Sequence, residues 1–500
     1  MPNPRAILVV DLAFGDCGKG TIIEYLARTQ NARAVVRFNG GPQAGHNVVT
    51  PDGRHHTFSQ FASAAFVPGV KTILSRFMLI EPYAMLNEAS HLAQLGVRNP
   101  MASLVIDRRC LVITPAQQAA NRLREIARGK GAHGTCGMGI GETMQDAIDH
   151  PDLALNAGDL SHRDTVIRTL RTIQALKVEQ LREAIRDFAV DAPARPTNPA
   201  QTATSVVGTS AQPAAIHGSQ ASARPADSTR AAQGYFAVQT LLDDSWIEVA
   251  ADNYLQVARL ATIADEPAIH AEMLAPETVV FEGAQGVLLD EYFGFHPHTT
   301  WSNTTFANAD ALLNEAGYAA PRTRLGVLRS YFTRHGPGPF VSENPSLKNQ
   351  LPEPHNADTG WQGAFRVGLF DAVAARYAIK ACGGLNSLAI THLDRLGHLP
   401  PQICTEYVED GMTARTERSI DDPLVRQGER IIDINPHLPA TLVCSARRTA
   451  ALAACRPIPA SIPVLSPAGF IDIVECELGA KVTIASSGPT ADQKRMLASL

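Results

Sequence analysis

The chain has 500 residues, 45% of them hydrophobic, and a formal net charge of −5. This composition allows a large core, and the negative charge without a polybasic tract disfavours nucleic acid or an anionic membrane as the main partner. No apolar run approaches membrane-spanning length, the first residues lack a signal-peptide layout, and the eight cysteines form no CxxC pair. We therefore expect a cytoplasmic protein with mostly reduced cysteines and no zinc.

The first predicted elements are a strand, a glycine-rich turn and a helix. Residues 7–10 form an apolar β-branched run typical of a buried strand, and a helical pattern begins near Gly20. Glycine amides, a helix N-terminus and Lys19 together favour a phosphate site, although Ala13 and Gly20 depart from the Walker A pattern. Asp16 beside such a site predicts a base or a metal ligand. The alternative is a tight turn with a solvated Lys19 and Asp16.

Further along, strands alternate with helices. Runs at 34–38, 72–74, 104–106, 279–281 and 387–390 predict strands, and residues 164–189 predict one amphipathic helix. This alternation predicts an α/β fold with a mostly parallel central sheet and flanking helices. Residues 191–234, rich in Ala, Pro and Ser, predict a disordered insertion; a solvated loop is favoured over a partner-binding segment.

Polar glycine-rich clusters follow several of the predicted strands. His46 ends a glycine loop and suits an acid or charge-stabilising role, whereas the alternative is a surface-turn histidine. Gln285 follows a strand and could pair with a purine edge, and Asp394 could accept two hydrogen bonds from guanine. Each cluster alone is a weak signal. Their order along the chain is the stronger one.

Taken in that order, the clusters resemble the adenylosuccinate synthetase family over nearly the whole chain. The family's first loop, Gly-Asp-Glu-Gly-Lys-Gly, matches residues 15–20 with Cys17 in place of glutamate. Other family motifs match residues 43–46, 134–141, 281–290, 302–305, 333–340, 391–394 and 486–489. Several long motifs in one order make the resemblance specific.

The resemblance implies a single domain over residues 1–500 with the P-loop-like GTP-binding architecture of that family. It implies a GTP-dependent ligase that joins IMP to L-aspartate with Mg²⁺, in a homodimer. Asp16 would take the N1 proton of the hypoxanthine ring and help hold Mg²⁺. His46 would stabilise charge as the GTP γ-phosphoryl group moves to the purine O6, before the aspartate amine displaces phosphate at C6.

The implied site residues fall into five groups. The catalytic residues are Asp16, Lys19, His46 and Gln285. The GTP-binding residues are Gly15, Gly18, Lys19, Gly20, His392, Asp394, Ser487 and Gly488. The purine-nucleotide residues are Gln43, Thr135, Gln285 and Thr300. The amino-acid residues are Asp358, Thr359, Gly360 and Arg366, and the Mg²⁺ ligands are Asp16 and Gly45.

Some substrate-gripping positions depart from the family pattern. Arg366 is the one arginine left where the family carries a cluster, and Asp358 replaces a threonine. No arginine-rich stretch follows residue 141 to reach across a dimer. These departures keep two alternatives open: the same oxygen activation with a modified purine or another amine donor, and an inactive GTP-binding regulator.

Overall fold

The structure is a computed structural model that describes residues 5–129, 134–191, 226–353, 361, 363–410, 421–462 and 466–500. Contacts divide the chain into two compact units, and the expectation of a single family-type domain stays a prediction. Unit 1 contains residues 1–40, 44–75 and 266–500, and unit 2 contains residues 41–43 and 76–265. Among the described residues, no helix is long and apolar enough to cross a membrane.

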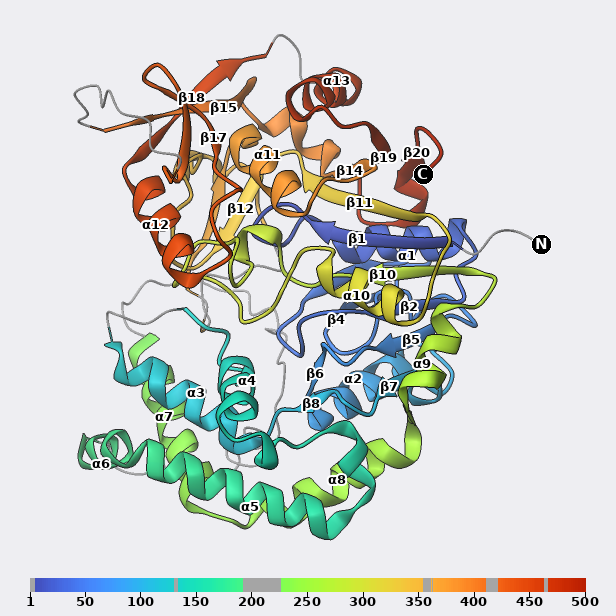
Figure 1. Ribbon diagram of the computed structural model, residues 1–500, viewed down its shortest axis with the longest axis vertical. Coiled ribbons are helices and arrows are strands. Elements are labelled where there is room, and N and C mark those ends of the chain that lie inside the picture. Colours follow the sequence, from blue (N-terminus) through green and yellow to red (C-terminus); the bar gives the residue numbers. More distant parts are fainter. Residues whose placement is uncertain are drawn as a thin grey trace. The chain divides into compact units, whose positions relative to one another are not determined.

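Unit 1 is built on a large sheet, which confirms the expected α/β class (Figure 1). In order across the sheet, the strands that belong to unit 1 are β20 (Lys494–Met496), β19 (Val482–Ser486), β14 (Ser387–Thr391), β11 (Arg322–Arg329), β1 (Arg5–Asp11), β10 (Thr278–Glu282), β2 (Ala34–Arg37) and β5 (Lys71–Leu74). Neighbouring strands are parallel except β19 and β20.

The other strands of unit 1 form small antiparallel pairs and one small sheet. The pairs are β3 (His46–Val49) with β4 (His55–Phe58) and β12 (Phe332–His335) with β13 (Phe365–Gly368). The sheet contains, in order, β16 (Leu424–Gln427), β17 (Arg430–Ile434), β15 (Gln402–Glu409) and β18 (Cys455–Ser461). The helices are α1 (Lys19–Thr29), α9 (Glu266–Met273), α10 (Ala307–Glu315), α11 (Ala372–Ala381), α12 (Leu442–Ala453) and α13 (Pro467–Leu478).

The buried strands explain why the sequence pattern identified this sheet. From residue 6 to residue 11 every side chain of β1 is buried, because parallel strands covered on both faces carry continuous apolar runs. The predicted strands at 34–38, 72–74, 279–281 and 387–390 match β2, β5, β10 and β14. Since these strands are parallel, their carboxyl ends lie along one edge, where ligands bind in open α/β sheets.

Unit 2 is mainly helical. Its helices are α2 (Pro82–Gln94), α3 (Pro115–Ala127), α4 (Ile140–Asp149), α5 (Arg163–Gln180), α6 (Arg182–Asp191), α7 (Ala226–Leu242) and α8 (Trp246–Leu260). Its strands are β6 (Leu79–Ile80), β7 (Leu104–Asp107), β8 (Leu111–Val112) and β9 (Thr262–Ala264). β6 pairs in parallel with β8, and β7 with β9.

Two expectations for unit 2 are corrected. The single helix predicted over 164–189 is two helices, because the chain leaves helical geometry at Leu181. Residues 226–234, expected within a disordered insertion, belong to α7, which packs on α3. Residues 192–225, the rest of the expected insertion apart from Asp191 at the end of α6, lie outside the described residues.

Candidate functional site

The loop between β1 and α1 carries the most unusual backbone of the site. Gly15, Asp16 and Gly18 all have left-handed conformations, with φ of 95°, 60° and 80°. Such a conformation is uncommon for a residue with a side chain. It directs the Asp16 side chain outward, where 34% of it is exposed and Oδ2 lies 3.6 Å from His335 Nε2.

The buried carboxylate of Asp11 occupies the inside of this loop. It accepts hydrogen bonds from the backbone N–H groups of Ala13 (2.9 Å), Gly15 (3.2 Å) and Cys17 (2.9 Å). The ammonium group of Lys19 lies 3.2 Å from the same carboxylate. Of the glycine amides expected to approach phosphate, that of Gly15 instead donates to this carboxylate of the chain itself.

The amides at the start of α1 remain as anion donors. Gly18 precedes the helix and has no side chain to cap it, and Gly20 lies in the first turn. Helix N-terminal N–H groups without a cap favour anions. An ideal Cβ on Gly20 would lie 2.9 Å from His46 Cβ, so only glycine lets the helix start approach this histidine.

The turn after β10 packs directly on the first loop. Gln285 has a φ of 58°, and its backbone oxygen accepts a hydrogen bond from Lys19 Nζ at 2.7 Å. A Cβ on Gly286 would lie 2.2 Å from the Ala13 oxygen, which explains the glycine. Within the described part of the chain, Gln285 Oε1 is buried without a hydrogen-bond partner, as expected for an amide that awaits a ligand.

His46 is held by a buried glutamate. Its Nδ1 lies 2.6 Å from Glu282 Oε1, and Glu282 also accepts hydrogen bonds from the backbone and hydroxyl of Ser63. Burial lowers the pKa of His46, and the hydrogen bond and charge of Glu282 oppose this. Burial alone would raise the pKa of Glu282, but His46, Arg37 and Ser63 together lower it. The net result is a lowered pKa of His46. Glu282 therefore orients the imidazole and offsets part of the burial that disfavours its charged form.

The predicted guanine residues lie at the carboxyl ends of β14 and β19, which are neighbours in the sheet. His392 follows β14 with a φ of 58°, and its Nδ1 lies 2.8 Å from Thr391 Oγ1. Burial, followed by Arg329 and other cations, holds the pKa of His392 well below its ordinary value. Thr391 Oγ1 also donates to the Cys17 backbone oxygen at 2.7 Å, which joins this segment to the first loop.

Asp394 and the segment after β19 complete that region. Asp394 is exposed and lies 3.2 Å from Arg395 Nε. Ser487 N donates to the Gln493 backbone oxygen at 3.0 Å, and a Cβ on Gly488 would lie 2.2 Å from Gln493 Oε1. The structure thus places His392, Asp394 and the 487–488 backbone after the ends of two adjacent strands.

The amino-acid residues are only partly described. Asp358, Thr359 and Gly360 lie outside the described residues. Arg366 on β13 is already engaged: it forms a paired contact with Glu343, and its third nitrogen donates to the oxygens of residues 336 and 338. A dicarboxylate substrate would have to displace Glu343 to use this guanidinium group.

The remaining nucleotide residues are divided between the units. Thr300 belongs to unit 1, and its N–H donates to Leu289 at 2.8 Å. Thr135 and Gln43 belong to unit 2. Thr135 Oγ1 accepts a hydrogen bond from Asn121 at 3.1 Å. Among the described residues, both polar side-chain atoms of Gln43 are buried without partners, which suits a ligand contact.

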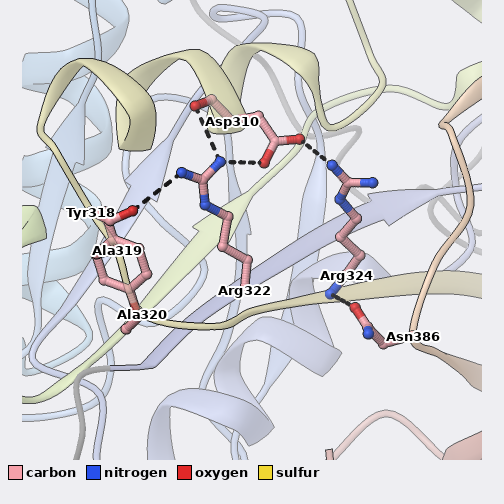
Figure 2. Close-up of a pocket in the computed structure, with 7 residues that line it drawn as sticks. All are labelled: Asp310, Tyr318, Ala319, Ala320, Arg322, Arg324 and Asn386. Carbon is pink, nitrogen blue, oxygen red and sulfur yellow. Dashed lines mark hydrogen bonds and ion pairs between the residues drawn. The ribbon is translucent and has the colours of Figure 1, made fainter.

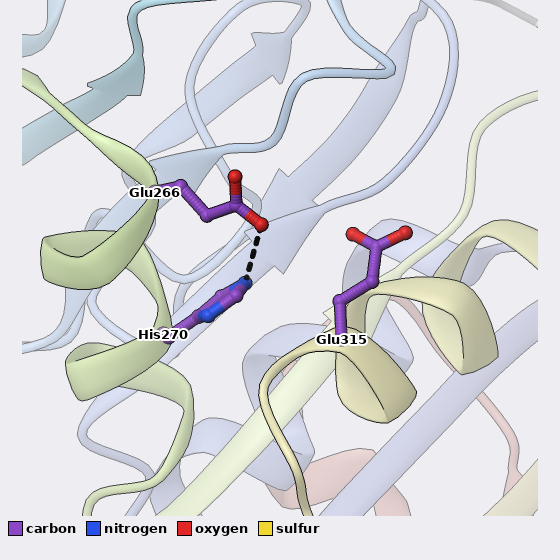
Figure 3. Close-up of side chains that lie close together, drawn as sticks. All are labelled: Glu266, His270 and Glu315. Carbon is purple, nitrogen blue, oxygen red and sulfur yellow. Dashed lines mark ion pairs between the residues drawn. The ribbon is translucent and has the colours of Figure 1, made fainter.

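The proposed Mg²⁺ ligands fit that ion by chemistry. Asp16 offers an exposed carboxylate and Gly45 an exposed backbone segment, and Mg²⁺ prefers oxygen ligands. A different cluster, Glu266, His270 and Glu315, brings three potential ligand atoms within 4.8 Å of one another on α9 and α10 (Figure 3). Since this cluster contains none of the motif residues, we do not assign it to the site.

One cavity in unit 1 lies elsewhere. It has a volume of about 490 Å³ and is lined by Asp310, Arg322 and Arg324 among others (Figure 2). Arg322 and Arg324 begin β11, so this cavity adjoins the amino end of that strand. The motif residues follow the carboxyl ends of strands, where ligands of parallel sheets bind. The cavity is therefore not the candidate active site.

Sequence reasoning assigned no role to Asp11, Glu282 or His335. Asp11 ends the apolar run of β1, and Glu282 follows three apolar residues of β10. Asp11 and Glu282 could have been noticed as charged residues at the buried end of a strand, because a buried charge needs a hydrogen-bond or ionic partner. His335 occupies a position that the 333–340 motif leaves open, and only the fold places it beside Asp16.

Comparisons with known proteins identify the family of the chain. A family model described as adenylosuccinate synthetase matches residues 8–211 and 228–495. The adenylosuccinate synthetase of Methylococcus capsulatus is 31% identical over 495 residues, covering 97% of this chain and 96% of the relative. That of Thioalkalivibrio sulfidiphilus is 31% identical over 409 residues, covering 80% of each.

Two solved structures share the fold. The fully ligated adenylosuccinate synthetase of Plasmodium falciparum matches with a TM-score of 0.67 and 17% identity, covering 98% of this chain and 99% of that one. The succinoaminodeoxyadenylate synthetase of cyanophage S-2L, bound to dGMP and to dATP as an energy donor, matches with a TM-score of 0.55 and 15% identity, covering 99% and 96%. At these identities the likeness concerns the fold alone.

Proposed function

The chain belongs to the adenylosuccinate synthetase family of ligases that form a C–N bond, and we propose that it joins IMP to L-aspartate at the expense of GTP. The products are adenylosuccinate, GDP and phosphate. An amide-like oxygen is a poor leaving group, so the purine O6 is first phosphorylated. The ring carbon can then be attacked by an amine.

The residues of the first loop and β3 suit the first step. The Asp16 carboxylate accepts the N1 proton of the purine, which makes O6 more nucleophilic toward the γ-phosphorus of GTP. Lys19 and His46 stabilise negative charge as the γ-phosphoryl group moves and GDP leaves. Mg²⁺, held by Asp16 and Gly45, would neutralise phosphate charge.

In the second step, the amine of aspartate attacks C6 and phosphate leaves with the bonding electrons. The amine loses its proton as the new C–N bond forms. Gln285, whose side-chain oxygen is buried and unpaired in the described structure, holds the purine during both steps. Asp394 accepts hydrogen bonds from the guanine of GTP.

Asp16 is the single observation that carries this proposal. A carboxylate at the tip of a loop beside Lys19 and a helix N-terminus repels phosphate. Its presence there is explained if it takes part in the reaction. Its left-handed backbone directs the side chain outward, toward solvent and His335. This placement supports a base that faces substrate.

Replacing Asp16 with Asn tests the proposed base. We expect turnover to fall by about 10²- to 10⁴-fold, the usual contribution of a general base. GTP affinity should fall much less, because Lys19 and the start of α1 still hold the phosphates and the amide oxygen of the new Asn can still bind Mg²⁺. GDP release and GTP affinity are the two measurements. Asp52→Asn, in the exposed turn after β3, is the matched control. Turnover retained by Asp16→Asn would contradict the assignment.

A second candidate differs in the amine donor. Nε and Nη2 of Arg366 already bind Glu343, so they are not available to the carboxylates of aspartate. This favours an amine donor with fewer negative charges. A panel of amino acids incubated with IMP, GTP and Mg²⁺ tests it. A donor better than aspartate would support this candidate, and a clear preference for aspartate would exclude it.

A further inference from the structure

The carboxylate of Asp11 has no role in the function proposed above, yet it binds three backbone N–H groups of the first loop. Asp11 is 1% exposed and receives the N–H groups of Ala13, Gly15 and Cys17 together with the Lys19 ammonium group. We propose that Asp11 is a positioning residue that holds Asp16 and Lys19 in their reactive arrangement. The proposal rests on the catalytic roles given to these two residues.

The hydrogen bonds of Asp11 act on both sides of Asp16. Gly15 N–H donates to Oδ1 and Cys17 N–H donates to Oδ2, so the residues immediately before and after Asp16 are fixed by the two oxygens of one carboxylate. A left-handed conformation costs a residue with a side chain about 1–2 kcal/mol. The flanking bonds help maintain this conformation, together with Arg329 Nη1, which donates to the Asp16 backbone oxygen at 3.2 Å.

Asp11 also restrains Lys19 in a defined direction. The ammonium group lies 3.2 Å from Asp11 Oδ2 and 2.7 Å from the Gln285 backbone oxygen. An ammonium group has three donors, so these two contacts leave one donor for a ligand. Lys19 is therefore aimed by fixed partners, and its long side chain loses little further freedom when phosphate binds.

The position of Asp11 also explains the cysteine in the loop. The family motif has glutamate where this chain has Cys17, and Cys17 is fully buried. Burial, and next the charge of Asp11, hold the pKa of the Cys17 thiol well above its ordinary value, so the thiol stays neutral. The positive charges of Lys19 and Arg329 oppose this rise in the pKa of the thiol. Asp11 thus provides the negative charge that the family loop carries at position 17.

A matched pair of variants tests this role. Asp11→Asn keeps the shape but presents an NH₂ group to one side of the loop. Asp107→Asn is the control, because Asp107 is also buried at the end of a strand and also accepts a backbone N–H and a cationic side chain, both from Arg109. A merely structural role would give the two variants similar losses of thermal stability and nothing more.

Two readouts separate this proposal from the proposed function. Hydrogen–deuterium exchange of residues 12–18, measured without ligand, should become at least about tenfold faster in Asp11→Asn and remain unchanged in the control. With saturating IMP, aspartate and GTP, kcat should fall at least about tenfold while KM for GTP changes less than about threefold. Unchanged exchange, or a loss confined to KM, would overturn the role of Asp11.

A double variant keeps the test decisive if the single variant is poorly folded. Asp11→Asn with Cys17→Glu returns one carboxylate to the loop at the family's position, and we expect its kcat to recover to within about fivefold of the wild-type value. No recovery in a folded double variant would contradict the charge relocation. If the wild-type protein makes no product, the proposed function fails, whereas the exchange measurement still decides whether Asp11 fixes the loop.

Discussion

The contact between His46 and Glu282 allows the contribution of one buried carboxylate to be predicted quantitatively. Glu282 accepts from His46 Nδ1 at 2.6 Å and from the Ser63 backbone at 3.1 Å. Glu282→Gln keeps the volume and removes the charge. When the new NH₂ group faces His46, Nδ1 must become the acceptor, so the imidazole is held neutral.

The size of the effect follows from this bond. A hydrogen bond to a charged group contributes about 1.5–3 kcal/mol, and about 1.4 kcal/mol corresponds to a tenfold change in rate. If the support of His46 matters only while charge moves onto the γ-phosphoryl group, kcat should fall by about 10- to 150-fold. KM for GTP should change little, because GTP binding before the phosphoryl transfer does not depend on a charged His46.

Steady-state GDP release at saturating IMP and aspartate measures this change. Ser63→Ala is the control, since it removes another partner of Glu282 and leaves the histidine contact. In a double-mutant cycle, His46→Gln with Glu282→Gln should cost no more than His46→Gln alone. A kcat within about threefold of wild type for Glu282→Gln, or additive losses in the cycle, would refute the reasoning.

Two further predictions concern stability. Burial raises the pKa of Glu81, the N-cap of α2, from 4.5 to about 7. As the pH rises, the Glu81 carboxyl therefore loses its proton in the unfolded chain before it does so in the folded one. The free energy of unfolding should fall between these pH values by up to about 3 kcal/mol. Glu81→Gln should remove that part of the slope in denaturant unfolding at several pH values, and an identical slope would contradict the burial argument. Gly338→Ala should destabilise more than Gly53→Ala, because a Cβ at residue 338 would lie 2.2 Å from Arg334 Nη2, whereas nothing lies within 4 Å at residue 53. Equal melting temperatures of the two variants would show that Arg334 moves away without cost.

The sheet of unit 1 could be predicted because its strands are buried on both faces and carry continuous β-branched runs. The break at Leu181 could not, because Leu181 and Ile185 are both buried and the apolar periodicity continues through it. The helical start of α7 was also missed. Residues 226–234 have little apolar periodicity, and the packing of α7 on α3 depends on the tertiary fold.

Within the site, the motifs predicted which residues gather but not what each contacts. His46, Gln285 and Lys19 lie together as expected. Asp11 was not predicted as the acceptor for the amides of the loop between β1 and α1. It belongs to the strand, and its carboxylate reaches these amides only because the turn at residues 15–18 is left-handed. For the same reason, no periodicity or spacing indicates that Arg366 is bound by Glu343.

The most direct test of the proposed function is a product analysis. Purified protein is incubated with GTP, Mg²⁺, IMP and L-aspartate, and the products are identified by mass spectrometry. The account predicts adenylosuccinate with an equal amount of GDP. GDP without adenylosuccinate would contradict aspartate as the donor and favour another amine, and the absence of both products would contradict the proposed ligase.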